Sequence, residues 1–554
     1  STRYGLGESR FKGDYSPGEL DYSHPFVLRE PHKCIKCGRC IRTCNEVQGI
    51  GAWGFVNRGF AATVEPTFQR PLDETECESC GQCVGACPTG ALLERVPGDK
   101  PGPFELNFVE STCTECGMGC AVTLGAVGQY LMKVQARSKC EGTNAGVLCQ
   151  TGRFDRVFDE ADKVRITKPM VCKDGKLVET SWDEAISKAA ELLGKGEKTG
   201  VFVSPTMTNE VAYQAGQLAR KVIGTNHVGT IERPCEKCFN AEAVDALEPT
   251  NYLAIKEADL VLFVDSKSLE MNKVVGNHVV GAINNGASLV VIGEGETKLD
   301  FYAGVKVDCK GDEIGSALRG LKDLASDGNG EVPGLIADEK AILAELLKSA
   351  KRPVIVANVD LRPAGDLEAL GVLKSAINGA NIVALRSLAN TEGSMRLGVD
   401  PVFGAGMKKA ATAGMYPGKL LADGNLEAAV VIGEDPLGKE GVAKALVDGF
   451  DKIANLVVMD SHLSKTAEKA HVLLPTPGSH EMDGTITNSE RRLQRVRPIG
   501  EPPAGKCHHG IFATLADKMG KKDALGDSTY PKDIFGQFVD LVDSWKGAKF
   551  DDLT

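Results

Sequence analysis

The chain has 554 residues, and its 42% hydrophobic content is ample for several domains with conventional cores. Its formal net charge of −11 argues against nucleic acid as a main partner, because phosphate binding needs a basic surface. No apolar run approaches the roughly 18 residues of a membrane span, and the first residues lack the apolar core of a signal peptide, so we expect a cytoplasmic protein.

Residues 1–33 are rich in glycine, proline, tyrosine and charge, and we expect an extended arm that docks on partner subunits. Two runs of cysteines follow within residues 34–105, and they repeat one another position for position. The first run is Cys34, Cys37, Cys40 and Cys44, and the second is Cys77, Cys80, Cys83 and Cys87. This is the spacing of bacterial two-cluster ferredoxins, in which the fourth cysteine of each run binds the cluster of the other run.

We therefore predict a ferredoxin-like domain with two [4Fe–4S] clusters. The first cluster takes Cys34, Cys37, Cys40 and Cys87, and the second takes Cys77, Cys80, Cys83 and Cys44. Zinc sites and a disulfide framework are the competing interpretations. Zinc usually takes pairs of CxxC rather than four ligands in one run, and thiols at this density fit a reducing compartment better than a disulfide scaffold.

A third signature, within residues 106–165, has a different spacing. It consists of Cys113, Cys116, Cys120 and, after a long gap, Cys149 in the segment Leu148-Cys149-Gln150-Thr151-Gly152-Arg153. The gap excludes another ferredoxin repeat, and Cys140 is a rival for the fourth ligand. Here the chain resembles the molybdopterin oxidoreductase superfamily, particularly the formate dehydrogenase catalytic subunit and the large iron–sulfur subunit of bacterial complex I. The resemblance implies a third [4Fe–4S] cluster, and its Leu-Cys-x-x-Gly-Arg setting favours Cys149 over Cys140.

In residues 166–554 short β-branched runs alternate with segments of helical spacing. The runs are 201–203, 260–264, 289–292, 354–356, 382–385, 430–432 and 456–459. Such a pattern predicts buried parallel strands joined by helices in a doubly wound α/β domain, with ligands at the carboxyl ends of the strands. The resemblance implies the large α/β domain of the superfamily, and we expect it to lack the C-terminal cap that binds the dinucleotides.

No complete GxGxxG follows a predicted strand, since Gly293-Glu294-Gly295 lacks the third glycine, so we expect no nicotinamide or flavin site. A flavin-containing partner that handles NAD(P)H would be another chain. No cysteine precedes Cys34, and His24 and His32 lack companion thiols, so additional iron–sulfur carriers would also belong to other subunits. These absences predict an obligate hetero-oligomer.

The parts that would bind molybdenum or tungsten are altered. The resemblance places the metal ligand at Cys235, but Glu236 stands where the superfamily has a histidine. Thr151 replaces a lysine between cluster and pterin, and Gly293-Glu294-Gly295 and Lys310-Gly311-Asp312-Glu313 replace two further pterin-binding motifs. We therefore favour a fold without a pterin. If a separate polypeptide supplied the cap domain, the chain could still bind a molybdenum or tungsten pterin.

The pair Cys235 and Cys238 has three interpretations. It can be two buried reduced thiols, a redox dithiol, or part of a metal site that needs two more ligands. The remaining candidate ligands are isolated in the sequence, and they are Cys140, Cys172, Cys309, Cys507, His508 and His509.

Three functions remain in view. The leading hypothesis is an electron-transfer subunit of a cytoplasmic oxidoreductase that moves single electrons through three [4Fe–4S] clusters. The alternative is a formate dehydrogenase-like catalytic subunit with Cys235 on molybdenum or tungsten. The third is a structural scaffold whose α/β domain organises partner subunits.

Overall fold

The computed structural model describes residues 19–95, 105–137, 143–158, 163–194, 196–231, 241–439, 444–526 and 529–553. The predictions on Cys140, Cys235 and Cys238, and most of the predicted arm, lie outside these residues. Across the described ranges, no helix is long and apolar enough to cross a membrane.

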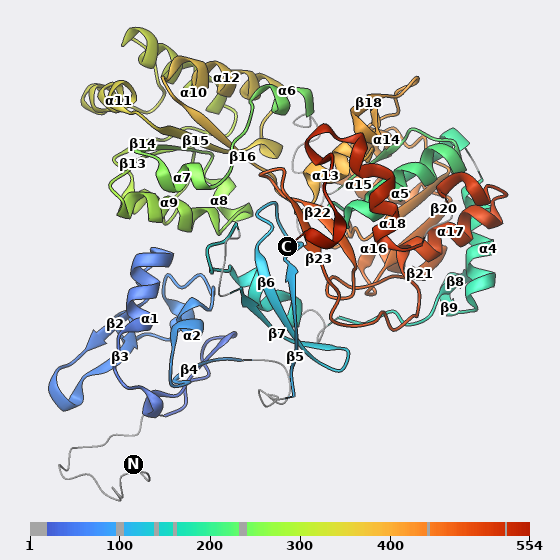
Figure 1. The fold of residues 1–554 in the computed structure, drawn as a ribbon, viewed down its shortest axis with the longest axis horizontal. Helices are drawn as coiled ribbons and strands as arrows, with labels where there is room; N and C mark the ends of the chain where they lie inside the picture. Colours follow the sequence, from blue (N-terminus) through green and yellow to red (C-terminus); the bar gives the residue numbers. More distant parts are fainter. Residues whose placement is uncertain are drawn as a thin grey trace, which may run out of the picture.

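A small ferredoxin-like unit lies at one end of the molecule (Figure 1). Its strands form two antiparallel pairs, β1 (Val27–Arg29) with β4 (Leu92–Glu94) and β2 (Trp53–Val56) with β3 (Thr63–Pro66). Its helices are α1 (Arg39–Arg42), the π-helical η3 (Thr43–Gln48) and α2 (Gln82–Ala86). Helices α1 and α2 begin after Gly38 and Gly81, whose φ angles of 69° and 68° lie in the left-handed region that favours glycine. The sequence repeat is therefore also a repeat of backbone conformation.

A three-stranded antiparallel sheet connects this unit to the rest of the chain. It contains β5 (Asn107–Thr112), β6 (Ala121–Val127) and β7 (Tyr130–Ala136), in that order. The loop between β5 and β6 carries three cysteines of the third signature, and the π-helical η7 (Thr151–Asp155) begins just after the fourth. The apolar side chains of this module, including Met118 and Val122, share one core with helices on a face of the five-stranded sheet.

The larger of the two α/β sheets has seven strands. Its order is β11 (Val228–Gly229), β10 (Thr199–Val203), β19 (Ala428–Ile432), β20 (Asn455–Asp460), β21 (Val472–Pro475), β8 (Met170–Lys173) and β9 (Lys176–Glu179). The first five strands are parallel, and β8 and β9 complete one edge in antiparallel fashion. One face packs on α4 (Trp182–Leu193), α5 (Asn209–Gln217) and α17 (His508–Lys518). The other packs on α14 (Pro417–Ala422), α15 (Lys444–Asp451) and α16 (Lys465–Glu468).

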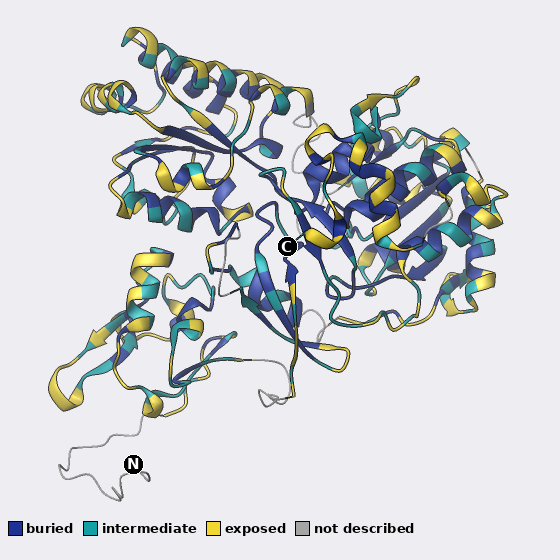
Figure 2. Ribbon diagram, viewed as in Figure 1, coloured by how far each residue is buried: buried dark blue, intermediate teal, exposed yellow. Residues whose placement is uncertain are grey.

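The second sheet has five strands, and all of them are parallel. Its order is β14 (Val305–Val307), β13 (Ser288–Ile292), β12 (Leu260–Val264), β15 (Pro353–Asn358) and β16 (Asn381–Leu385). Helices α7 (Leu253–Glu257), α8 (Lys267–Met271) and α9 (Val275–Asn284) cover one face. Helices α6 (Ala241–Ala246), α10 (Ile314–Asp327), α11 (Ala337–Ser349) and α12 (Ala364–Ala376) cover the other. Figure 2 shows the parallel strands of both sheets as largely buried, whereas the edge strand β9 is mostly exposed.

The predicted α/β fold class is confirmed, and all seven predicted runs lie in strands. They divide between two sheets, because the five-stranded sheet is inserted in the chain between β11 and β19. The remaining described α-helices and β-strands are β17 (Phe403–Gly404), β18 (Lys408–Lys409), α13 (Thr391–Arg396), β22 (Gly484–Thr487), β23 (Leu493–Val496) and α18 (Pro531–Phe538).

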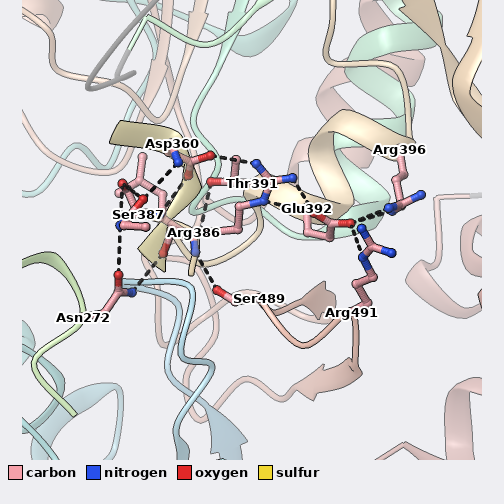
Figure 3. Close-up of polar contacts among 11 residues, drawn as sticks. Asn272, Asp360, Arg386, Ser387, Thr391, Glu392, Arg396, Ser489 and Arg491 are labelled. Atoms are coloured by element: carbon pink, nitrogen blue, oxygen red, sulfur yellow. Dashed lines mark hydrogen bonds and ion pairs between the residues drawn. The ribbon is translucent and has the colours of Figure 1, made fainter. Parts of the chain in front are cut away.

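A buried network of charges joins the two sheets (Figure 3). Arg386, which follows β16, donates to Asp360 at 2.8 Å and to Glu392 of α13 at 2.7 Å. Glu392 also accepts from Arg396 at 2.8 Å and pairs with Arg491 at 3.2 Å. Burial alone would raise the pKa of Glu392, but the three guanidinium groups outweigh it and lower the pKa to about 2. The carboxylate is therefore held ionised at the junction of the two sheets.

Replacement of Glu392 by glutamine should destabilise the protein by about 3–5 kcal/mol, because three guanidinium groups then lose their shared partner. Since folding lowers the pKa of Glu392 from 4.5 to about 2, its contribution is complete above about pH 5 and is lost as the pH falls toward 2. Thermal unfolding followed by circular dichroism should show that the difference in unfolding temperature between wild type and Glu392→Gln becomes smaller as the pH falls through that range. The control is Glu368→Gln, at an exposed position of α12, which should leave the unfolding temperature unchanged.

Candidate functional site

The first thiol group consists of Cys34, Cys37, Cys40 and Cys87. These four side chains line one cavity of about 60 Å³, and Cys37 is exposed to solvent. The backbone N–H of Lys36 donates to the Cys34 Sγ at 3.4 Å, a contact of the kind that stabilises a thiolate. Burial raises the pKa of Cys40 to about 11, and the other three thiols of the group add to the shift. The structure thus brings Cys87 to the first run, as the ferredoxin spacing predicts.

The second thiol group consists of Cys77, Cys80, Cys83 and Cys44. Burial raises the pKa of Cys80 to about 12, and Cys77 and Cys44 are its thiol neighbours. Burial also raises the pKa of Cys77 to about 11, with Cys44 contributing again. The backbone N–H of Ala52 donates to the Cys44 Sγ at 3.3 Å. Cys44 therefore lies with the second run rather than with its own.

The third thiol group consists of Cys113, Cys116, Cys120 and Cys149. These residues line a cavity of about 180 Å³ between the β5–β6 loop and the start of η7. The Gly152 N–H donates to the Cys149 Sγ at 3.4 Å, and burial raises the pKa of Cys113 to about 11. Cys149 is thus placed with the other three residues of the third signature.

The geometry of the three groups favours a cluster over a zinc ion. The described part of the chain contains no three His, Cys, Asp or Glu side chains that converge closely enough to hold one metal ion. Zinc would require each thiolate about 2.3 Å from a single centre. A [4Fe–4S] cluster instead spreads four thiolates around a cube, which suits thiols that line a cavity. All cysteines in the described ranges are free, so none of them forms a disulfide there.

Arg153 links the second thiol group to the third. Its Nε donates to the Cys80 carbonyl oxygen at 2.9 Å, and its Nη2 donates to Gln82 at 2.8 Å. Its own backbone N–H donates to the carbonyl oxygen of Cys149 at 3.1 Å. The side chain is only 4% exposed, and burial lowers its pKa against the opposing effects of Glu94, which lies 3.7 Å away, and of thiols of both groups. Sequence reasoning did not assign Arg153 a role, although it follows Cys149 within the same motif.

Stacked aromatic rings lie beside this contact. Phe154 stacks on Phe26 of the ferredoxin-like unit, with ring centroids 5.0 Å apart and planes 13° apart. Gly81 lies so close that an added Cβ would meet the Arg153 Cδ at 2.5 Å and the Phe154 ring at 2.8 Å. The loops that carry the second and third thiol groups therefore touch one another.

A larger cavity of about 540 Å³ lies at the carboxyl ends of β10, β19, β20 and β21. Its polar wall includes Asp435, Asp460 and Lys465, and the third module closes it through Glu115 and Arg156. Arg156 donates to Glu115 at 2.7 Å, and burial raises the pKa of Asp460. The open side of a parallel sheet is where ligands bind in this class of fold.

At the corresponding edge of the five-stranded sheet, charged side chains pair with one another. Asp265 follows β12 with a φ of 68°, and its carboxylate accepts from Arg362 at 2.5 Å and from the Lys267 N–H at 3.0 Å. Next to it, Arg386 and Asp360 belong to the buried charge network, and all four charged side chains are less than 9% exposed. The cavity of the third thiol group opens at this same edge, where Glu270, Met271 and Lys273 come after β12 and Ser387 and Leu388 come after β16. Cys235 lies outside the described residues.

The architecture and the thiol groups agree with comparisons with known proteins. Residues 165–515 match the family model of molybdopterin oxidoreductases. The chain belongs to this family. Residues 24–93 match the ferredoxin-like domain of NADH-quinone oxidoreductase subunit 3, which supports iron–sulfur clusters in the first unit. The predicted resemblance is therefore confirmed.

The proteins of similar sequence include two kinds of oxidoreductase. The chain is 30% identical to a subunit of an NADH-quinone oxidoreductase of Rhizobium meliloti, over 99% of this chain and 70% of that protein. It is 24% identical to a putative formate dehydrogenase of Staphylococcus haemolyticus, over 99% of this chain and 66% of that protein. The solved acetylene hydratase from Pelobacter acetylenicus shares the fold, with a TM-score of 0.63 at 15% identity over 80% of this chain and 73% of that one. The chain is thus an oxidoreductase subunit, and it spans about two thirds of the length of these two sequence relatives.

The exchange of fourth cysteines between the two runs predicts which variants resemble one another. Cys87→Ser should perturb the same electron paramagnetic resonance signal as Cys34→Ser, and Cys44→Ser the same signal as Cys77→Ser, with a loss of about one to four irons each. The exposed Cys507 belongs to no thiol group, so Cys507→Ser should keep the full iron content. If Cys87→Ser instead matched Cys77→Ser, the assignment of Cys87 to the first thiol group would be wrong.

Proposed function

We propose that this chain relays single electrons through three [4Fe–4S] clusters, one in each thiol group, as a subunit of a larger oxidoreductase complex. The ligands are the first thiol group (Cys34, Cys37, Cys40, Cys87), the second (Cys77, Cys80, Cys83, Cys44) and the third (Cys113, Cys116, Cys120, Cys149). The observation that carries the proposal is their continuity. The first two groups share one small fold, and Arg153 contacts the backbone of the second and third.

The protein contributes position and potential to such a relay. Backbone N–H groups directed at sulfur, as at Cys34, Cys44 and Cys149, stabilise the more negative, reduced cluster and so raise its reduction potential. The guanidinium of Arg153 acts in the same direction at its two neighbours. The relay needs no proton transfer, because each step moves one electron between clusters of fixed ligation.

The ends of the relay belong to partner subunits. No complete GxGxxG follows a predicted strand in the sequence, so we assign the flavin and the NAD(P)H to a separate chain. The similarity to a subunit of an NADH-quinone oxidoreductase supports such an assembly. Electrons enter or leave at the first cluster, which has the exposed Cys37, on the side of the ferredoxin-like unit.

Removal of the Arg153 charge should lower the potentials of the second and third clusters. Arg153→Gln keeps hydrogen-bonding capacity but loses the cation, and we expect a tenfold change in the reduction equilibrium, which is about 59 mV for one electron. Redox titration followed by electron paramagnetic resonance measures the shift. Arg153→Lys retains the charge and should keep most of the native potential; equal shifts in both variants would show that packing, and not charge, is responsible.

Metal content tests the proposal as a whole. The anaerobically purified native complex, analysed by mass spectrometry, should contain about twelve irons per chain after subtraction of partner clusters, with neither molybdenum nor tungsten. An iron content near eight per chain would mean that one of the three thiol groups binds no cluster, and the proposed relay would be wrong at that group.

A second candidate function rests on the cavity at the seven-stranded sheet. Its size, its position at the carboxyl ends of the strands, and the adjacent Glu115 and Arg156 of the third module favour a bound polar cofactor. The cofactor of a formate dehydrogenase-like enzyme would supply a molybdenum or tungsten centre for two-electron chemistry, with Cys235 as its ligand and Asp435 and Lys465 among the residues at its tail. Near-stoichiometric molybdenum or tungsten in the same measurement would establish this function and overturn the simple relay.

A further inference from the structure

The first thiol group opens on an exposed apolar surface. Ile35 is 64% exposed and lines the same cavity as the exposed Cys37. Phe55 and Phe60, at the β2–β3 hairpin, are 56% and 79% exposed. Figure 2 shows the turn of this hairpin as exposed, at the end of the molecule farthest from the seven-stranded sheet. Three large apolar side chains are thus exposed on the part of the ferredoxin-like unit that carries the exposed Cys37.

Contacts join these side chains into one face. The Lys36 Nζ donates to the Phe60 carbonyl oxygen at 3.1 Å. Gly38, between Cys37 and α1, lies under the Phe55 ring, and a Cβ added there would meet the ring at 3.3 Å and the Arg42 guanidinium at 3.5 Å. We call this surface the hairpin face, and its members are Ile35, Lys36, Arg39, Arg42, Phe55, Arg58 and Phe60.

The hairpin face is basic, although the chain as a whole is acidic. Residues 29–70 contain seven lysines and arginines against three acidic residues, whereas the net charge of the chain is −11. Lys36, Arg39, Arg42 and Arg58 are exposed and form no ion pair within the described part of the chain. The acidic residues of the unit collect instead before the second run, where residues 71–78 contain four and no cation. The separation of charge therefore coincides with the separation of the two thiol groups.

We propose that the hairpin face is a docking site for an acidic single-electron carrier protein, which exchanges electrons with the first cluster. The inference rests on the proposed relay and names its partner at this end. The apolar side chains exclude water beside Cys37, and the surrounding cations attract a carboxylate-rich surface and speed its encounter. In each exchange the carrier loses one electron and the first cluster gains it, or the reverse, and no bond or proton changes place.

The test uses the full chain, purified anaerobically with its clusters. A chemically reduced, acidic plant-type [2Fe–2S] ferredoxin is mixed with the oxidised chain in a stopped-flow instrument, and its reoxidation is followed by absorbance. The second-order rate constant should fall about tenfold between about 0.01 M and about 0.15 M ionic strength, because the attraction is screened. The salt dependence of the native chain tests the proposal even if a variant fails to fold.

Charge reversal locates the site. The double variant Arg42→Glu with Arg58→Glu should slow the reaction about tenfold and weaken its salt dependence, and Phe60→Ser should slow it several-fold. The matched control, Lys176→Glu with Lys221→Glu, changes the same number of charges on exposed residues of the seven-stranded domain and should react as the wild type. Iron content and reduction by dithionite should be unchanged in all variants.

Three results would overturn the docking site. They are a rate without salt dependence, an equal loss of rate in the control variant, and a change of oligomeric state in the double variant by analytical ultracentrifugation, since that would identify a second copy of this acidic chain as the occupant. If the wild-type chain contained no reducible clusters, the relay itself would fail. Clusters that dithionite reduces but ferredoxin does not would be a fourth result against the docking site, and it would leave the relay untouched.

Discussion

The arrangement of the first 149 residues depends on bringing twelve thiols together inside a protein. Burial raises the pKa of Cys40, Cys80 and Cys116, one in each group, and neighbouring thiols raise it further, so four thiolates cannot be held together without positive charge between them. Iron supplies that charge. The described core of the ferredoxin-like unit includes seven buried residues, among them Cys83, and several cysteines pack directly against it. Cluster binding and folding of this unit should therefore be a single event.

The α/β part of the molecule obeys a different constraint. Parallel sheets collect loops, and therefore polar side chains, at the carboxyl ends of their strands. At the seven-stranded sheet these loops surround a cavity of about 540 Å³. At the five-stranded sheet Asp265 pairs with Arg362 and Asp360 with Arg386, beside the cavity of the third thiol group. The third module therefore lies against the carboxyl ends of both sheets.

The local features of the molecule could be predicted from the sequence, whereas most of its long-range contacts could not. The cysteine runs predicted which thiols meet, because a spacing of two residues places three ligands on one loop and the ferredoxin pattern assigns the fourth to the other run. Buried β-branched runs such as 260–264 predicted strands for the same reason. Nothing local indicated that residues between β11 and β19 form their own sheet, or that Asp265 would pair with Arg362 across 97 positions. The contact of Arg153 could not be predicted from the sequence either, since its partner Cys80 is 73 positions away.

The central claim, three iron–sulfur clusters in one continuous line, is tested most directly by diffraction. Crystals of the anaerobic protein, measured at the iron absorption edge, yield an anomalous difference map that locates iron without reference to spectra. We predict three strong peaks, one within each thiol group, with the second and third on either side of Arg153. A thiol group without a peak, or a peak outside all three groups, would contradict the relay.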